Sequence, residues 1–185
     1  MIPCRNEKVQ NAVAYFAEQH RKKSKRYLYQ TFLYKYLAFL DFYSLKETGR
    51  PALDLVYKAM KKGPVPIEIY EHKTETPKYK FVKDEWGEFV VAKGKPDLDY
   101  FSLYEINLMD RLLEIFARKW VTSTQASDSS HERIKAWQRT WAQCPNGIID
   151  PALEFEGDLF RKKEDQLSYS EEVYLTYRAL KNIEC

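Results

Sequence analysis

The sequence predicts an α+β fold that is predominantly helical, with a compact helical core and one small β-hairpin. Residues 27–47 are apolar or aromatic on every side of a helix, which is typical of the central helix of a bundle. Capping boxes of the form Ser-x-x-Glu mark two later helix starts, at Ser102 and Ser168. The strand-like runs 79–83 and 88–92 flank a short polar turn, which indicates a hairpin.

Composition sets the class of protein before any motif is considered. The chain has 185 residues, enough to bury one core of moderate size. Hydrophobic residues make up 44% of it and charged residues 31%, which excludes a disordered tail and a fibre. Aromatic residues reach 15%, which indicates either a dense aromatic core or an aromatic contact surface.

The first two helices are expected close to the N-terminus. Asn6 can cap the first helix, and the basic run 21–26 ends it. The second helix covers 27–47. Gly49 then supplies a left-handed C-terminal stop, and Pro51 prevents the helix from continuing.

The middle of the chain alternates breakers and short elements. A short element is expected at about 53–61, and the run Gly63-Pro64-Val65-Pro66 breaks it. Pro66 suits the first turn of a new helix that continues to about Lys73. The hairpin follows, with its turn at 84–87.

Three further helices are expected after the hairpin. The first starts at the capping box of Ser102 and runs to about Trp120. The polar stretch 122–130 leads into a helix that contains Trp137. The last helix covers about 171–182.

The charges are unevenly distributed, although the net charge is only +3. Residues 1–50 carry ten basic and four acidic groups, whereas residues 151–185 carry five basic and eight acidic groups. The basic excess concentrates in the run from Arg21 to Arg26. This run is either a solvated linker between helices or a patch that contacts phosphates.

The sequence is typical of a reducing, cytoplasmic compartment. The three cysteines form no C-x-x-C pair, which argues against a disulfide framework and a zinc knuckle. Residues 1–10 contain charges and no apolar run, so we expect no signal peptide. The most apolar stretch, 27–45, is interrupted by Lys35 and Asp41, so we expect no membrane span.

No catalytic, cofactor-binding or metal-binding set can be assembled from the sequence. His131-Glu132 begins like the zinc motif H-E-x-x-H, but Lys135 replaces the second histidine. Gly87 and Gly94 are too far apart for a phosphate-binding loop. Cys144 and His131 could form a thiol–imidazole pair, but no third group to orient them is evident. We therefore predict a binding protein without cofactor, and not an enzyme.

Two blocks in the first half of the chain resemble a known family. A hydrophobic helix that contains Asp41 and Tyr43 leads into the turn Thr48-Gly49-Arg50-Pro51. About a dozen residues later, Gly63-Pro64-Val65-Pro66 leads to Tyr70. In order and spacing the blocks resemble the SocA-like, or Panacea domain, antitoxins, which are also described as phage-associated proteins. A looser third block contains Ser102 and Glu105, then His131 and Trp137. The motif residues, which argue chiefly for the fold, are Asp41, Tyr43, Gly49, Pro51, Gly63, Pro64, Val65, Pro66, Tyr70, His131 and Trp137.

The resemblance implies an antitoxin of a toxin–antitoxin pair, which neutralises a cognate protein toxin by direct binding. It also leaves open a proteolytic adaptor that delivers the toxin to a Clp-type protease. An alternative of another class is a nucleic-acid-binding regulator that uses Arg21–Arg26. We assign 1–155 to the SocA-like domain, and 156–185 to an acidic segment and C-terminal helix that pack on this domain or extend it.

Two regions are candidates for contact with the toxin. If residues 27–47 are helical, Tyr29 points about 200° away from Tyr27, so one of the two faces meets something other than the main packing partner. That neighbour is either a second layer of the same domain or the toxin. The acidic tail suits a basic toxin, and its candidate contact residues are Glu164, Asp165, Glu171 and Glu172.

Overall fold

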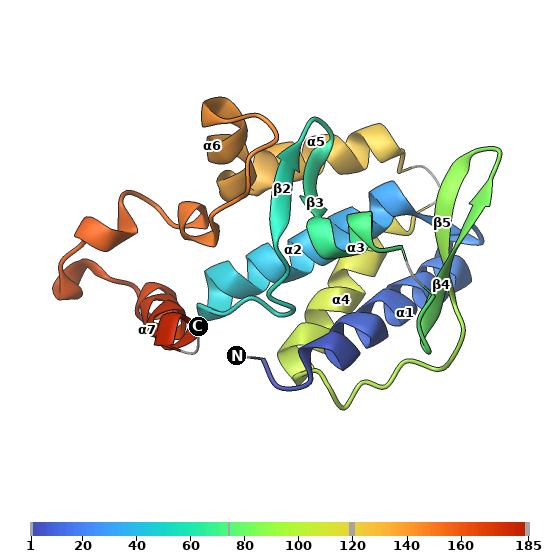
Figure 1. Ribbon diagram of the computed structural model, residues 1–185, viewed down its shortest axis with the longest axis horizontal. Helices are drawn as coiled ribbons and strands as arrows, with labels where there is room; N and C mark the ends of the chain where they lie inside the picture. Colours follow the sequence, from blue (N-terminus) through green and yellow to red (C-terminus); the bar gives the residue numbers. More distant parts are fainter. Residues whose placement is uncertain (1, 74, 119–120, 184–185) are drawn as a thin grey trace.

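The structure is a computed structural model that describes residues 2–73, 75–118 and 121–183. In these ranges seven α-helices accompany two small antiparallel sheets, which confirms the predominantly helical α+β fold. The longest axis of the molecule runs from α7 (Tyr169–Ile183) at one end to β4 (Tyr79–Asp84) at the other (Figure 1).

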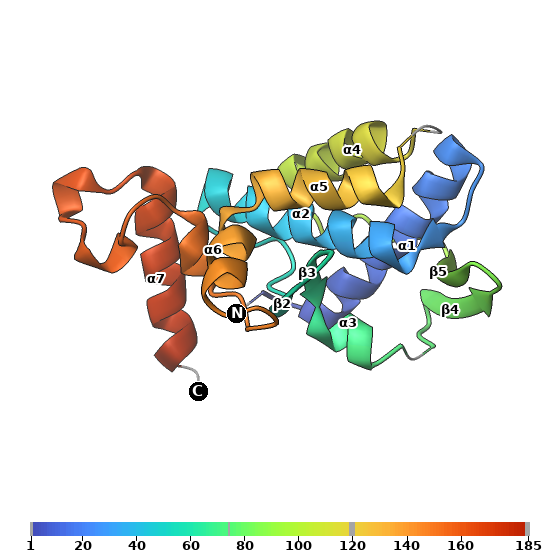
Figure 2. The ribbon, with the colours of Figure 1, turned by 90° about the horizontal axis from the view of Figure 1, so that it is seen from above.

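Helix α2 (Gln30–Thr48) forms the centre of the molecule. Every residue from Leu33 to Phe42 is buried, as expected for a helix that is apolar on all sides. Helices α1 (Arg5–Ser24), α4 (Leu103–Phe116) and α5 (Ser123–Arg133) pack along it (Figure 2). The predicted central helix is therefore confirmed.

Aromatic side chains hold these helices together. The ring of Phe16 stacks on Tyr36 with centroids 4.6 Å apart, and Phe39 stacks on Phe116 at 5.3 Å. His20 Nδ1 lies 2.9 Å from the hydroxyl of Tyr36. Each pair of packed aromatic rings contributes about 0.5–1.5 kcal/mol to stability beyond the contribution of its buried area. Part of the aromatic content is thus core.

Two predicted helix starts are wrong. Helix α1 begins at Arg5, so Asn6 lies inside its first turn and caps nothing; Cys4 precedes the helix with φ 50°. Helix α2 begins at Gln30 because Leu28 and Tyr29 form the short strand β1. The helical angle expected between Tyr27 and Tyr29 therefore does not apply.

Strand β1 completes a three-stranded sheet in the order β1–β5–β4. Its residues Leu28 and Tyr29 pair with Val90 and Phe89 of β5 (Gly87–Ala92). Strand β5 in turn pairs with β4, which confirms the predicted hairpin.

A second hairpin joins β2 (Tyr57–Met60) to β3 (Gly63–Pro66), so the expectation of a single hairpin is wrong. The run Gly63–Pro66, expected to be a breaker, is a strand. It tolerates two prolines because it pairs with a strand on one side only. Helix α3 (Ile67–Glu71) follows Pro66 directly and ends before the predicted Lys73.

The later helices differ from expectation mainly in their bounds. The capping box of Ser102 opens α4, which ends at Phe116; the predicted end at Trp120 lies outside the described residues. The polar stretch expected to precede a helix is itself α5, capped by Thr122 and Gln125. Helix α6 (Lys135–Gln143) follows it.

The C-terminal part runs through three short 3-10 turns to α7. The second capping box is present, because the Ser168 amide donates to the Glu171 carboxylate at 2.8 Å and the Glu171 amide donates to Ser168 Oγ at 3.4 Å. Helix α7 packs against the end of α2 at Gly49, whose φ of 77° confirms the predicted left-handed stop. No described helix is both long and apolar enough to cross a membrane.

Candidate functional site

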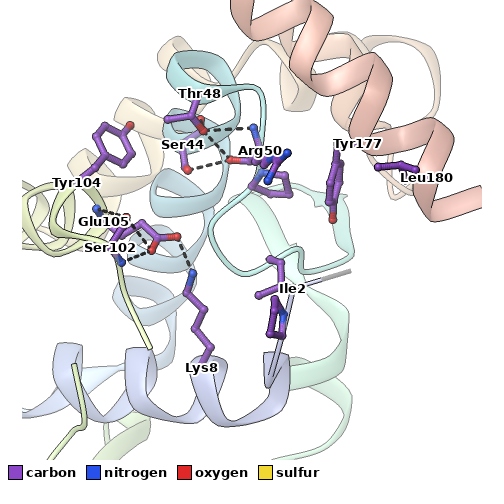
Figure 3. Close-up of a pocket in the computed structure, with 12 residues that line it drawn as sticks. Ile2, Lys8, Ser44, Thr48, Arg50, Ser102, Tyr104, Glu105, Tyr177 and Leu180 are labelled. Atoms are coloured by element: carbon purple, nitrogen blue, oxygen red, sulfur yellow. Dashed lines mark hydrogen bonds and ion pairs between the residues drawn. The ribbon is translucent and has the colours of Figure 1, made fainter. Parts of the chain in front are cut away.

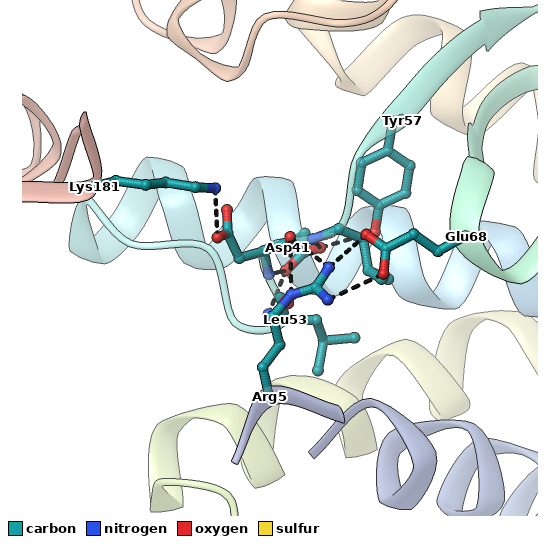
Figure 4. Close-up of polar contacts among 8 residues, drawn as sticks. Arg5, Asp41, Leu53, Tyr57, Glu68 and Lys181 are labelled. Carbon is teal, nitrogen blue, oxygen red and sulfur yellow. Dashed lines mark hydrogen bonds and ion pairs between the residues drawn. The ribbon is translucent and has the colours of Figure 1, made fainter. Parts of the chain in front are cut away.

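Asp41 lies in the middle of α2 and is almost completely buried. Its carboxylate accepts hydrogen bonds from the amides of Leu53 (2.5 Å) and Leu55 (3.2 Å) and from the hydroxyl of Tyr57 (2.9 Å), as Figure 4 shows. This side chain therefore fastens the loop that follows α2 to the helix. Burial raises the pKa of Asp41 to about 6, although these three donors favour its charged form.

Arg5 of α1 extends this network to the loop after α2 and to α3. Its guanidinium donates to the carbonyl oxygens of Leu53 (3.1 Å) and Asp54 (2.9 Å) and to both carboxylate oxygens of Glu68 (2.6 and 3.0 Å). Lys181 of α7 forms an ion pair of 2.6 Å with Asp54. Since these groups bind one another, the network around Asp41 supports the fold.

A cleft of about 540 Å³ lies between the start of α1, the end of α2, the start of α4 and α7 (Figure 3). The buried ion pair of Lys8 and Glu105, 2.7 Å long, lies on its wall. Ser44 Oγ donates to the Arg50 carbonyl at 2.8 Å. Several polar groups of this cleft are thus paired with each other, and its motif residue, Pro51, is buried in the turn after α2.

The second hairpin covers the buried side chain of Lys35, which was not among the candidate residues predicted from the sequence. Lys35 of α2 is 2% exposed, and its ammonium group donates to the carbonyl of Lys62 at the tip between β2 and β3. Gly63, with φ 110°, leaves the space that this ammonium occupies; a Cβ there would overlap it. The sequence signal that could have identified this buried lysine is its position within the most apolar stretch of the chain.

Two motif residues of the third block, His131 and Trp137, lie beside this hairpin. The ring of His131 stacks on Trp137 with centroids 4.1 Å apart. The indole of Trp137 donates to the Met60 carbonyl at 3.1 Å. The structure thus brings His131 and Trp137 close to the hairpin that contains Gly63, and Trp137 binds this hairpin directly.

Burial lowers the pKa of Lys35 to about 7. Burial and the charge of Lys35 also lower the pKa of His131. No ion pair of Lys35 is found among the described residues. Below its folded pKa the ammonium is charged in a site that solvates it poorly, which destabilises the fold.

We expect this lysine to make the protein more stable as the pH rises. Between a folded pKa of about 7 and the ordinary value of 10.5, only the unfolded state holds the proton, so unfolding becomes harder with increasing pH. The unfolding free energy should rise by about 1 kcal/mol from about pH 7.5 to about pH 8.5, below the range in which tyrosines begin to titrate. Urea titrations at several pH values measure it.

Lys35→Met is the matched control for this pH dependence. It keeps the stem of the side chain and removes the titrating group. The variant should show a nearly flat pH profile over the same window. Parent and variant profiles of equal slope would contradict the assignment to Lys35.

Two hollows beside the second hairpin are neighbours. They have volumes of about 380 and 590 Å³ and share Gln30, Thr31 and Lys62 in their linings. We call the two neighbouring hollows together the α2 groove. It runs from the hairpin β2–β3 and α3 to the tip of the hairpin β4–β5, across the first turn of α2.

The predicted contact residues lie at opposite ends of the molecule (Figure 1). Tyr29 lines the α2 groove and donates to Asp84 at 2.7 Å. Glu164, Asp165 and Glu172 are exposed near α7, at the other end. Glu171 is unsuited to toxin contact, because it is buried and its carboxylate binds Ser168 and Lys162.

Most of the remaining motif residues form the second hairpin or follow it directly, and Tyr43 lies on α2. Pro64, Val65 and Pro66 form β3 with Gly63, and all four are buried. Tyr43 packs edge-on against Phe39 at 5.2 Å. Tyr70, 42% exposed, faces Tyr34 at 6.2 Å on the rim of the α2 groove.

The basic run is largely engaged within the molecule. Lys22 pairs with Glu18 at 2.5 Å, Lys23 pairs with Glu114, and Arg21 lies over the ring of Tyr27. Arg26 instead lines the α2 groove. These pairs reduce the charge that the run could offer to phosphates.

Comparison with known proteins gives a family assignment for the central part of the chain. The family model described as Antitoxin SocA-like, Panacea domain matches residues 33–138, more than half of the chain. The matched range contains all the motif residues and most of the α2 groove, and it excludes the acidic C-terminal part. No curated protein and no solved structure matches the chain.

Proposed function

Since the chain belongs to the antitoxin SocA-like, Panacea domain family, we propose that it neutralises a cognate protein toxin by binding it directly. The observation that carries this proposal is the family match over 33–138. A cytoplasmic location beside the toxin is part of it. The buried motif residues support a scaffold, and the α2 groove offers this scaffold a partly exposed surface with aromatic and basic side chains.

Co-expression tests the proposal. The protein encoded by the adjacent gene should arrest growth when produced alone, and this chain should restore growth and co-purify with it. Full growth arrest in the presence of this chain at matched expression would contradict an antitoxin role. Purification of the pair in a fixed ratio separates direct binding from repression of the toxin gene.

A proteolytic adaptor is the second candidate, because the molecule has exposed surfaces at both ends. Phe160 is 56% exposed and Tyr169 is 76% exposed near α7, far from the α2 groove (Figure 2). An adaptor must hold toxin and protease together, so two separate surfaces favour it. We expect that rescue by direct binding persists in a strain without Clp proteases, with an unchanged toxin half-life. Rescue that disappears in that strain would identify an adaptor.

A further inference from the structure

We propose that the toxin docks in the α2 groove through an acidic segment that carries a large apolar side chain. This inference rests on the proposed antitoxin function and names the surface and the chemistry of the partner. It follows from the charges of the groove, from its exposed aromatic rings and from the way in which its two tips are held.

The groove has a surplus of positive charge. Arg26, Lys61 and Lys62 are exposed and form no ion pair with any residue that the structure describes. The carboxylate that lines the groove, Glu88, is already paired with Lys73. Charge complementarity therefore favours an acidic segment.

Each of the two hollows also presents an aromatic ring. Trp86 is 79% exposed at the turn between β4 and β5, and Tyr70 is 42% exposed beside β3. Exposed Trp, Tyr and Arg side chains are enriched among the residues that dominate binding at protein interfaces. Apolar residues Met60, Pro64 and Val65 line the second hollow, which suits a large apolar side chain of the partner.

Hydrogen bonds within the protein hold the tips of the two hairpins, β2–β3 and β4–β5, in place. Asp84 accepts hydrogen bonds from the hydroxyl of Tyr29 (2.7 Å) and from the amide of Trp86 (2.9 Å), which fixes the tip of β4–β5. Lys35 donates to the carbonyl of Lys62 and fixes the tip of β2–β3. A surface that is ordered before binding loses less conformational entropy on binding.

The other surfaces fit a toxin less well. The polar groups in the cleft of Figure 3 are largely paired with one another. The acidic end near α7 lies outside the residues that match the family. Nucleic acid would need more free cations than Arg26, Lys61 and Lys62, since each phosphate contact adds little by itself.

Charge reversal at the groove tests the inference. The probe is the purified protein encoded by the adjacent gene, and the full-length chain is used throughout. Lys61→Glu with Lys62→Glu should weaken binding by about tenfold or more. Lys95→Glu with Lys163→Glu is the matched control, because both lysines are exposed and lie outside the groove. It should change the Kd by less than about twofold.

A second pair of variants tests the aromatic contribution. Trp86→Ala should weaken binding by about tenfold, whereas Tyr169→Ala, which removes an equally exposed ring at the other end, should leave binding unchanged. Circular dichroism and melting temperature verify that each variant is folded. Raising the salt from about 0.05 M to about 0.5 M should weaken binding of the parent, and less so of the lysine variant.

The outcomes separate this inference from the proposed function. If the parent binds and rescues while the folded groove variants do so equally well, the groove is wrong and the antitoxin function stands. If the matched controls lose as much affinity, or if binding is independent of salt, the acidic partner segment is wrong. Groove variants that lose affinity for DNA or RNA but not for the toxin would also overturn the inference. A parent that neither binds nor rescues overturns the proposed function itself.

Discussion

Replacing Asp41 with alanine is expected to lower the unfolding free energy by about 3–5 kcal/mol. The carboxylate is buried, and the amides of Leu53 and Leu55 and the hydroxyl of Tyr57 donate to it. Alanine removes the acceptor and leaves these donors without a partner in a place that water does not reach. Each buried donor that stays unsatisfied costs about 1–3 kcal/mol, offset in part because the charge no longer has to be buried.

The effect should be large enough to be seen in cells. A domain of this size is stable by about 5–15 kcal/mol, so the Asp41→Ala variant would lose much of its folded population at growth temperature. Urea denaturation measures the loss, and rescue of growth should decrease with it. Asp99→Ala is the control, because Asp99 is exposed and the structure gives its carboxylate no hydrogen bond or ion pair among the described residues.

Asp41→Asn separates the two causes. Asparagine keeps one acceptor oxygen and nearly the same shape, but it adds two donors where acceptors are needed. We expect a loss between zero and that of the alanine variant. If Asp41→Ala denatures at the same urea concentration as Asp99→Ala, then Asp41 does not hold the loop as the structure indicates.

The sequence predicted those elements whose signals are local. The central helix shows in the apolar residues on all sides of α2, and the two capping boxes and the hairpin of β4 and β5 show in short patterns. Gly49 was identified because the whole signal for this helix end, a glycine followed closely by a proline, lies within residues 49–51. Burial, caps and turns of this kind depend on neighbours in sequence, so composition and spacing report them.

The elements that were missed depend on partners far along the chain. Leu28 and Tyr29 have the same apolar character as the helix after them, and only pairing with β5 makes them a strand. Strand β3 contains two prolines, so local rules mark it as a breaker, and only its pairing with β2 reveals it.

The candidate site was predicted in part. The motif residues Gly63, His131 and Trp137 were named from the family resemblance, but nothing in the sequence showed that they meet around one hairpin. Lys35 was missed because a buried charge has no periodic signal. Toxin contact by Tyr29 and by the exposed acidic residues near α7 stays a prediction.

Gly49 carries the last prediction, because two constraints meet at this residue. Its φ of 77° is a conformation that β-branched residues resist, at a cost of about 1–2 kcal/mol. A side chain there would also meet α7: a Cβ would overlap the carbonyl oxygen of Ser170 and lie 2.7 Å from Cβ of Val173. A valine must therefore either strain the end of α2 or displace α7.

Gly49→Val is expected to cost about 3 kcal/mol or more, measured by urea denaturation. Gly157→Val measures the conformational cost alone, since Gly157 also has a positive φ, 72°, but its nearest neighbour would lie 3.8 Å away. Gly94→Val, at an exposed glycine without a positive φ, should cost almost nothing. If Gly49→Val costs no more than Gly157→Val, then α7 does not pack against Gly49. Helix α7 packs against the end of α2 at a contact that only a glycine allows. If Gly49→Val costs more than Gly157→Val because it displaces α7, residues 169–183 should show faster proteolysis or faster hydrogen exchange.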